Sequence, residues 1–212
     1  MVNKHKQRSK ETRKIILTAA GKLFASKGYD AVTMREIAKE ANCSHTTIYL
    51  YFKDKQSLLH HLSMPPLLEL HDKLKEIAMM DSFSPEEKLK EISREFIYFC
   101  LYHKNIYRVL INEKSLKVDE TEPESELNRL RVKLFAILRQ AIGQCLSIPD
   151  NDELLAYSRI FFYNLYGVLS TYSYQHESTD ALMARLSPTF ELAVSVLILG
   201  FKEKIKENEE KQ

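Results

Sequence analysis

Residues 33–55 read TMREIAKEANCSHTTIYLYFKDK, and this stretch predicts two short helices joined by a tight turn. Thr33 and Glu36 have the spacing of a capping box, in which the hydroxyl accepts a hydrogen bond from the third amide and the carboxylate bonds back to the first. We expect the first helix to end near Ala41, because residues 42–44 (Asn-Cys-Ser) have turn chemistry. Asn tolerates a positive φ, so the turn is sterically possible.

The second of these helices is predicted over residues 45–51, with Ser44 as its N-cap. Ile48 and Phe52 are expected to face inward, which leaves hydroxyls, an imidazole and aromatic rings exposed. Lys and Glu dominate an ordinary exposed helix face, so this composition is unusual. It suits a helix that enters the major groove of DNA, where such groups reach base edges and phosphates.

A longer helix is predicted before this stretch, from Thr12 to Lys27. Its apolar residues follow the i, i+3, i+4 spacing of one buried stripe, and Gly28 stands where a residue with positive φ commonly ends a helix. Three helices with a short turn predict a helix-turn-helix domain. The alternative is a generic small helical bundle with a basic surface.

Charge divides the chain unevenly. Residues 1–60 hold twelve Lys/Arg against five Asp/Glu, a net charge of +7, whereas the remaining residues hold nineteen against twenty-four, a net charge of −5. A basic first segment on a mildly acidic body indicates that the first segment contacts a polyanion. The basic residues before the first helix fit either a flexible arm on DNA or a disordered, solvated terminus; they are Lys4, Lys6, Arg8 and Lys10.

The rest of the chain is predicted to be helical, since glycine and proline are few. Residues 84–87 (Ser-Pro-Glu-Glu) are a strong helix start, and residues 118–125 are predicted to be a loop. The predicted helices cover residues 54–62 and 67–79, separated by a break at Pro65-Pro66, then a helix from residue 84 through Cys100, and helices over residues 126–146, 153–174 and 188–206.

Several classes of protein are excluded by what the sequence lacks. Cys43, Cys100 and Cys145 are distant from one another and form no CxxC pair, so neither a disulfide framework nor a zinc site is expected, and a reducing cytoplasm is the simplest location. No uninterrupted apolar run approaches the roughly 18 residues that cross a bilayer. No glycine-rich phosphate loop, nucleophile elbow or set of metal ligands is present, so we expect no enzyme, cofactor or metal.

The stretch from Thr33, followed by the residues from Ala41 to Leu59, closely resembles the TetR (tetracycline-repressor) family. The resemblance implies an all-α fold, with an N-terminal three-helix DNA-binding domain at 1–54 and a helical ligand-binding and dimerisation domain at 55–212. It also implies a homodimer on a palindromic DNA operator, usually released when a small ligand enters the second domain. Thr46 departs from the family pattern, where Gly or Pro is frequent.

Carried over position by position, the resemblance implies two sets of DNA contacts. Base edges would be contacted by Arg35, His45, Thr46, Thr47 and Leu50, and phosphates by Thr33, Ser44, Tyr49, Tyr51, Lys53 and Lys55. A guanidinium can reach guanine with two hydrogen bonds, and hydroxyls with ammonium groups can hold the DNA backbone.

Two further sets of residues are predicted in the second domain. Aromatic rings with polar tips line many small-molecule sites, so a pocket for a lipophilic ligand is predicted at Tyr98, Tyr102, His103, Tyr107, Phe135, Phe161 and Tyr166, with ordinary core packing as the alternative. The last two helices carry apolar residues on more than one face, which indicates either a dimer interface or burial in one large monomer core. The interface is predicted at Phe161, Leu165, Leu169, Phe190, Val194, Leu197, Ile198 and Phe201. A DNA-binding regulator or chromosome-organising protein without any effector is the alternative function.

Overall fold

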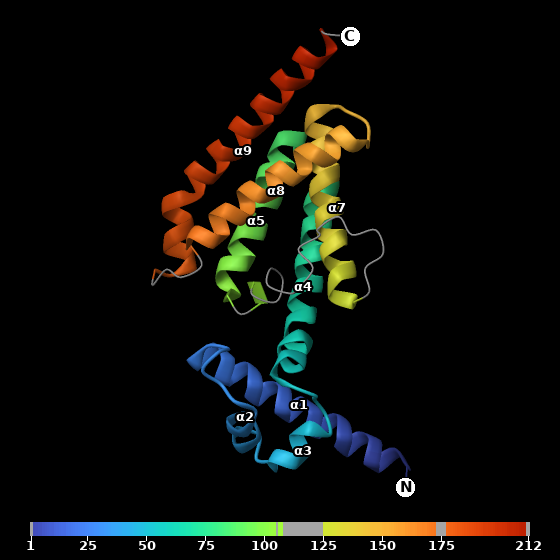
Figure 1. The fold of residues 1–212 in the computed structure, drawn as a ribbon, viewed down its shortest axis with the longest axis vertical. Coiled ribbons are helices and arrows are strands. Elements are labelled where there is room, and N and C mark those ends of the chain that lie inside the picture. Colours follow the sequence, from blue (N-terminus) through green and yellow to red (C-terminus); the bar gives the residue numbers. More distant parts are fainter. Residues whose placement is uncertain (1, 105, 108–124, 173–176, 211–212) are drawn as a thin grey trace. The chain divides into compact units, whose positions relative to one another are not determined.

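The computed structural model describes residues 2–104, 106–107, 125–172 and 177–210, and these residues form helices and no strands (Figure 1). The chain divides into two compact units, which we call the head and the body. The head comprises Met1–Leu67 with Asn105–Lys114, and the body comprises Leu68–Lys104 with Ser115–Gln212. The division falls inside a helix, thirteen residues beyond the boundary expected after residue 54.

The head is built from α1 (Val2–Lys27), α2 (Met34–Glu40), α3 (His45–Tyr49) and the first turns of α4 (Lys55–Met79). α1 packs on α2, and α2 packs on α3. Each helix contributes a fully buried side chain to one small core, from Ile16 in α1 to Leu58 in α4. The periodicity that predicted three helices with one buried stripe each is therefore confirmed.

α1 begins at Val2 and not near residue 12. The predicted alternatives for the basic terminus, a flexible arm and a disordered tail, are both wrong for residues 6–11, which are an exposed part of this helix. The physical reason is composition: Lys, Gln and Arg are good helix formers, and no Gly or Pro interrupts them. Once residues 12–27 are held by packing, the helix extends at little cost.

α4 runs without interruption through Pro65 and Pro66, so the predicted break is wrong. Each proline removes a backbone donor and costs about 3 kcal/mol inside a helix. Packing outweighs this cost, because buried apolar residues continue along α4 on both sides of the prolines, from Leu58 to Ile77. Burial of each such side chain is worth roughly 1.5–3 kcal/mol.

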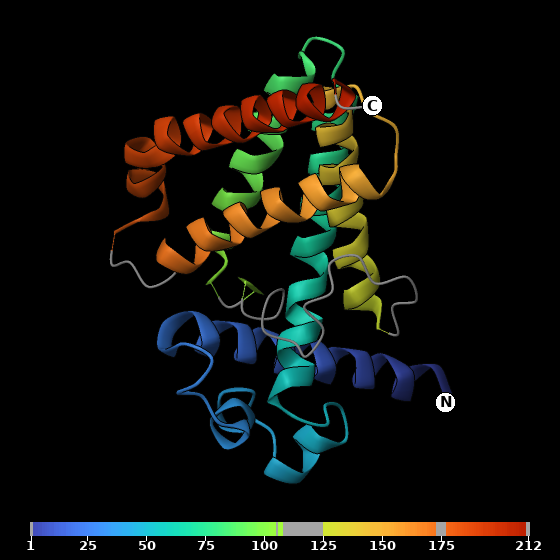
Figure 2. The ribbon, with the colours of Figure 1, turned by 45° about the horizontal axis from the view of Figure 1, so that its top comes forward.

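Among its described residues, the body contains the rest of α4 and four further helices, α5 (Pro85–Tyr102), α7 (Glu126–Leu146), α8 (Asp152–Tyr172) and α9 (Thr179–Glu209). α5 packs on α7, α8 and α9, and α7 also packs on α8 and α9. Figure 2 shows α8 and α9 lying across α5 and α7. The start of α5 is confirmed as a capping box between Ser84 and Glu87.

α7 has the predicted bounds, whereas α9 begins nine residues before the predicted start at Pro188. Pro188 lies inside α9, and Ser178 is the N-cap of this helix. The prediction therefore placed the start of the helix too late, at a proline that the helix contains. The loop predicted over residues 118–125 lies outside the described residues except for Ser125, which caps α7.

α9 is long and apolar enough, by length and composition alone, to cross a membrane. The search for uninterrupted apolar runs did not find this segment, because charged residues interrupt the segment. In the structure one side of α9 packs on α5 and α7, as a core helix does.

Candidate nucleic-acid interface

The N-terminus of α2 is held by the predicted capping box. The Thr33 hydroxyl accepts a hydrogen bond from the Glu36 amide at 3.2 Å, while the Thr33 amide donates to the Glu36 carboxylate at 2.9 Å. The Thr33 hydroxyl also donates its only proton to that carboxylate, at 2.9 Å. The Thr33 hydroxyl is thus engaged within the cap of α2.

The turn between α2 and α3 depends on Asn42, which has a φ of 50°. This left-handed conformation is tolerated by Asn far better than by β-branched residues. The Cys43 amide then donates to the Ala38 carbonyl at 2.9 Å, which closes the end of α2. The expectation that Asn preserves the turn is confirmed.

Ser44 is the N-cap of α3, as predicted. Its hydroxyl oxygen accepts a hydrogen bond from the Thr47 amide at 2.9 Å, and its distance to the Thr47 hydroxyl is 2.7 Å. α3 spans only His45–Tyr49, so this cap stabilises most of the helix. The hydroxyls of Ser44 and Thr47 are thus hydrogen-bonded to each other at the start of α3.

The outward side of α3 presents the unusual side chains that the sequence predicts. His45 and Thr46 are exposed, and Leu50 is 79% exposed, whereas Ile48 is fully buried. The His45 ring packs edge-on against the Tyr49 ring, with centroids 5.1 Å apart. Arg35 and Lys53 are also exposed, and Tyr51 is half-buried.

Two ion pairs join α1 to α2. Lys27 donates to Glu36 at 2.9 Å, and Lys22 pairs with Glu40 at 2.5 Å. The hydrogen bond from Lys27, followed by those from the backbone and side chain of Thr33, lowers the pKa of Glu36 from 4.5 to about 2. Glu36 thus acts both as the capping residue of α2 and as the partner of α1.

We expect Glu36→Gln to lower the thermal midpoint of unfolding at pH 7, because Gln keeps the shape of the cap but lacks the charge. The folded-state pKa of Glu36 is lowered to about 2, below its ordinary value of 4.5. The stabilisation is therefore complete above pH 4.5 and is lost as the pH falls towards 2. Circular-dichroism melts across this range should show the difference between wild type and variant shrinking to nothing.

The matched control for this prediction is Glu11→Gln, on the exposed surface of α1. It should leave the midpoint close to that of the wild type throughout. A deficit of Glu36→Gln that stays the same from pH 7 to pH 2 would contradict the charge argument.

Lys55, at the start of α4, makes several contacts within the head. Its ammonium donates to the backbone carbonyls of Tyr29 at 2.7 Å and Val32 at 2.8 Å, and it lies 3.4 Å from that of Asp30. It also lies 4.3 Å from the centre of the Tyr29 ring. The side chain that the resemblance assigns to a phosphate is thus directed into the head.

These helices form a helix-turn-helix with a capped, exposed second helix, and residues 16–62 match the family described as bacterial regulatory proteins, tetR family. The chain belongs to the TetR family of transcriptional regulators. It is therefore a DNA-binding regulator and not an enzyme.

Matches to related proteins extend beyond the head. The chain is 25% identical to the uncharacterised regulator YhgD of Bacillus subtilis, over 72% of this chain and 81% of that protein. A higher identity, 48% to YuxN of Bacillus subtilis, covers only 24% of this chain and 17% of that protein. The high-identity match thus spans well under two thirds of that relative.

Solved structures of TetR-family regulators share the fold. A regulator from Thermobifida fusca has a TM-score of 0.61 at 20% identity, covering 85% of this chain and 97% of that chain. FadR from Bacillus subtilis, in complex with stearoyl-CoA, has a TM-score of 0.59 at 21% identity, covering 87% and 97%. The body of this TetR-family regulator therefore has the same helical architecture as those proteins.

The seven residues predicted for a ligand pocket differ in their burial and in the unit to which they belong. Phe135 and Phe161 are buried core side chains, whereas Tyr102 and Tyr166 are exposed and Tyr107 belongs to the head. Tyr98 donates from its hydroxyl to Asp180 at 3.1 Å and stacks on Tyr102. His103 packs against Phe99, and burial lowers the pKa of its imidazole. For Phe135 and Phe161, the helical spacing of the aromatic residues reflects ordinary core packing.

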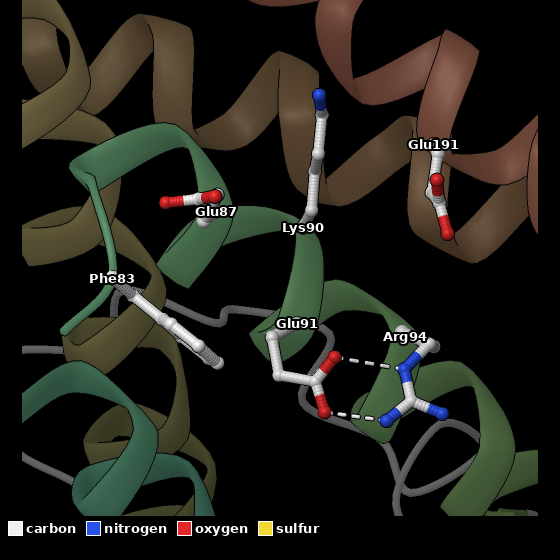
Figure 3. Close-up of a pocket in the computed structure, with 6 residues that line it drawn as sticks. All are labelled: Phe83, Glu87, Lys90, Glu91, Arg94 and Glu191. Carbon is white, nitrogen blue, oxygen red and sulfur yellow. Dashed lines mark hydrogen bonds and ion pairs between the residues drawn. The ribbon is translucent and has the colours of Figure 1, made fainter. Parts of the chain in front are cut away.

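A hollow of about 260 Å³ lies elsewhere in the body, between α5 and α9 (Figure 3). Figure 3 shows Glu91 and Arg94 joined by two hydrogen bonds on one side of it, with Lys90 and Glu191 nearby. The guanidinium of Arg94 lowers the pKa of Glu91. This lining is charged, so the hollow does not have the apolar character predicted for the ligand site.

The residues predicted for the dimer interface lie mostly on the sides of α8 and α9 that face their own chain. Seven of the eight are buried within their own chain, and Leu197 is half-buried, so these side chains are not a surface for a second copy. The reason is that both helices carry apolar residues on opposite faces, and the prediction chose the face that packs on α5 and α7. The exposed apolar residues of α8 and α9 are Ile160, Tyr163, Tyr166, Leu192, Val196 and Leu199.

The three cysteine thiols are in environments that favour the protonated form. Burial raises the pKa of Cys100 and of Cys43, and raises that of Cys145 to about 11, which keeps these groups protonated at neutral pH. Protonated thiols are poor nucleophiles and poor metal ligands. Within the described ranges, no group of three His, Cys, Asp or Glu side chains is placed to hold a metal ion.

Proposed function

We propose that this TetR-family protein is a homodimeric repressor that binds a palindromic operator and leaves it when a small lipophilic ligand binds the body. It works in the cytoplasm, where its DNA lies. The observation that carries the DNA part is the capped α3, whose exposed face holds His45, Thr46 and Leu50. Such side chains read base edges in the major groove.

The six exposed apolar residues of α8 and α9 form what we call the outer face: Ile160, Tyr163, Tyr166, Leu192, Val196 and Leu199. They recur every three residues in α8 and at steps of four and three residues in α9, whereas the buried residues of both helices lie between them in the sequence. An exposed patch of this kind marks an interaction site more often than it marks ordinary surface. Its occupant is a second copy of the chain, because a twofold dimer presents two α3 helices to two half-sites.

Two glycines support a close helix contact at the outer face. Gly167 in α8 and Gly200 in α9 are exposed, and an added Cβ at either would meet no atom of its own chain. Glycine inside a helix costs about 1 kcal/mol relative to alanine. Glycines beside Tyr163 and Val196 allow the backbones of two subunits to approach closely, which offsets that cost in the dimer.

In the dimer, the spacing between the two α3 helices determines which DNA sites the protein can bind. Half-sites one helical turn apart, about 34 Å, are matched only when the two α3 helices hold the corresponding spacing. A ligand that binds more tightly to a conformation with a different spacing of these helices shifts the population away from the DNA-bound form. The lipophilic class of ligand is supported by the aromatic content of α5 and α8 and by the fold shared with FadR, whose structure holds stearoyl-CoA.

Selection of duplexes from a random-sequence library, followed by footprinting, tests the DNA part. We expect the purified protein to select a palindrome and to protect two half-sites about one helical turn apart. Selection of a sequence without twofold symmetry, or of none above background, would contradict the proposal.

Stearoyl-CoA, stearic acid and free coenzyme A are suitable probes of the ligand part. A lipophilic effector should raise the thermal midpoint of the protein and release it from the selected duplex, while coenzyme A alone should do neither. If no acyl compound changes either reading, this result favours a DNA-binding regulator without an effector. The burial of Phe135 and Phe161 as core residues would fit that alternative.

A further inference from the structure

His45 and Tyr49 are the first and last residues of α3, and their rings are in contact. The two positions are one helical turn apart, so both side chains lie on the same side of the helix. The rings pack edge-on, with centroids 5.1 Å apart and an angle of 77° between their planes. Tyr49 is 46% exposed and His45 is exposed as well, so the pair is presented outward.

This contact restricts the orientation of the imidazole before any DNA is bound. An exposed side chain on a helix otherwise samples several rotamers. A side chain that becomes ordered only on binding weakens the complex, because it loses that freedom at the interface. Edge-to-face packing is a favourable geometry for aromatic rings. The Tyr49 ring therefore favours one orientation of His45, and the Tyr49 hydroxyl takes no part in this contact.

The hydrogen-bonding groups of His45 differ from those of its neighbours in being available. The hydroxyls of Ser44 and Thr47 are bonded to each other. Within the part of the chain that the structure describes, neither ring nitrogen of His45 makes a hydrogen bond. In a helix-turn-helix, the N-terminal residues of the second helix contact base edges. His45 thus offers an oriented donor for a base at the start of α3.

The chemistry of an imidazole donor selects among the four bases. An imidazole carries at least one N–H donor, whichever nitrogen holds the proton. In the major groove, guanine presents two neighbouring acceptors, N7 and O6, whereas adenine presents one acceptor beside an amino donor. Cytosine presents a donor, and thymine presents an acceptor beside a methyl group. Guanine is therefore the best match, because either acceptor can receive the proton and no donor opposes it.

We propose that His45 reads a guanine in each half-site, and that Tyr49 is a positioning residue whose ring holds the His45 imidazole ready for this contact. The inference rests on the proposed operator binding. It adds to the resemblance, which implies a base contact for His45 and a phosphate contact for Tyr49 but specifies no base. The hydroxyl of Tyr49 stays available for a phosphate while its ring orients His45.

The experiment begins with the duplex that the wild-type protein selects from a random library. Each guanine of this duplex is replaced by adenine, symmetrically in both half-sites, and a scrambled duplex of the same length measures nonspecific binding. Affinities are obtained by fluorescence anisotropy for the wild type and for variants of His45 and Tyr49. Melting curves confirm that each variant is folded, as the exposure of both side chains leads us to expect.

For His45, we expect one guanine position at which adenine lowers the wild-type affinity about tenfold for each half-site. His45→Ala should bind the guanine and adenine duplexes equally. His45→Gln should instead prefer adenine at this position, because a carboxamide pairs with the donor and acceptor of adenine. Both variants should bind the scrambled duplex as the wild type does.

Tyr49→Phe and Tyr49→Leu are the matched pair that separates the ring from the hydroxyl. Tyr49→Phe keeps the ring, so it should weaken both duplexes by the same factor and retain the preference for guanine. Tyr49→Leu loses the ring as well, so it should weaken both duplexes and also lose most of that preference. A residue that served only as a phosphate contact would give the same preference in both variants.

Three results would overturn the inference. A selected duplex with no guanine whose preference depends on His45 removes the reading role. A Tyr49→Leu variant with the wild-type preference removes the positioning role, and so does a Tyr49→Phe variant that loses the preference. Failure of the operator proposal is distinct from all of these, because it appears as a wild-type protein that selects no duplex.

Discussion

Val196→Glu should convert the regulator from a dimer into a folded monomer. Val196 is 57% exposed and lies in the outer face, between Leu192 and Leu199 on α9. In a twofold dimer this position meets the same surface of the second copy, so two carboxylates would be buried near each other without partners. An unpaired buried charge costs roughly 3–5 kcal/mol, which is enough to separate most dimers at micromolar concentration.

Loss of the dimer should reduce operator affinity far more than any single contact can. Two linked heads gain about 10²- to 10⁴-fold over one head, because the second binds from a high effective concentration. Analytical ultracentrifugation and anisotropy on the selected duplex measure the two effects, while circular dichroism and melting curves report whether the body remains folded.

Met79→Glu is the matched control for this substitution, since Met79 is also an exposed apolar residue of the body but lies at the end of α4. The control should remain dimeric and bind the operator normally. A wild-type monomer, or a Val196→Glu protein that stays dimeric, would contradict the assignment of the outer face.

The structural features that could be predicted from the sequence are those that depend on only a few adjacent residues. The capping boxes at Thr33 and Ser84 are present, because a hydroxyl and a carboxylate three residues apart need nothing beyond their own turn. The left-handed Asn42 is equally local. Prediction failed at Pro65-Pro66, where packing on both sides outweighs a strong local preference.

The candidate site was predicted less completely than the fold, because the direction of a side chain is not encoded in its spacing. Lys55 occupies the position of a phosphate contact in the family pattern, and its ammonium also donates to the carbonyls of Tyr29 and Val32. α8 has apolar residues on two faces, so periodicity alone could not distinguish Phe161, which is buried, from Tyr163, which is 62% exposed. Only the positions of α5 and α7 determine which face is internal.

Phe52→Ala should unfold the head and abolish DNA binding while the body remains helical. Phe52 is 1% exposed, and the centre of its ring lies 5.0 Å from the guanidinium carbon of Arg13 in α1 and 5.4 Å from the centre of the His61 ring in α4. Truncation of a buried Phe costs roughly 3–5 kcal/mol. A unit as small as the head, which comprises Met1–Leu67 and Asn105–Lys114, buries too little surface to absorb that loss.

Leu50→Ala provides the contrast, because Leu50 lies two residues away and is 79% exposed. We expect its melting curve to match that of the wild type, since no packing is lost. Its affinity for the selected duplex should fall about tenfold, the range of one lost base contact such as that with a thymine methyl group. The scrambled duplex should bind as it does to the wild type.

The two variants together test which side of α3 faces DNA. Thermal melts, circular dichroism and anisotropy should separate them, with Phe52→Ala losing head structure and all DNA binding, and Leu50→Ala losing selectivity alone. If Leu50→Ala also melts early, or if Phe52→Ala keeps normal affinity, the inner and outer sides of α3 have been assigned incorrectly. The assignment of His45 and Thr46 to base edges would then fail as well, because these residues share the outward side with Leu50.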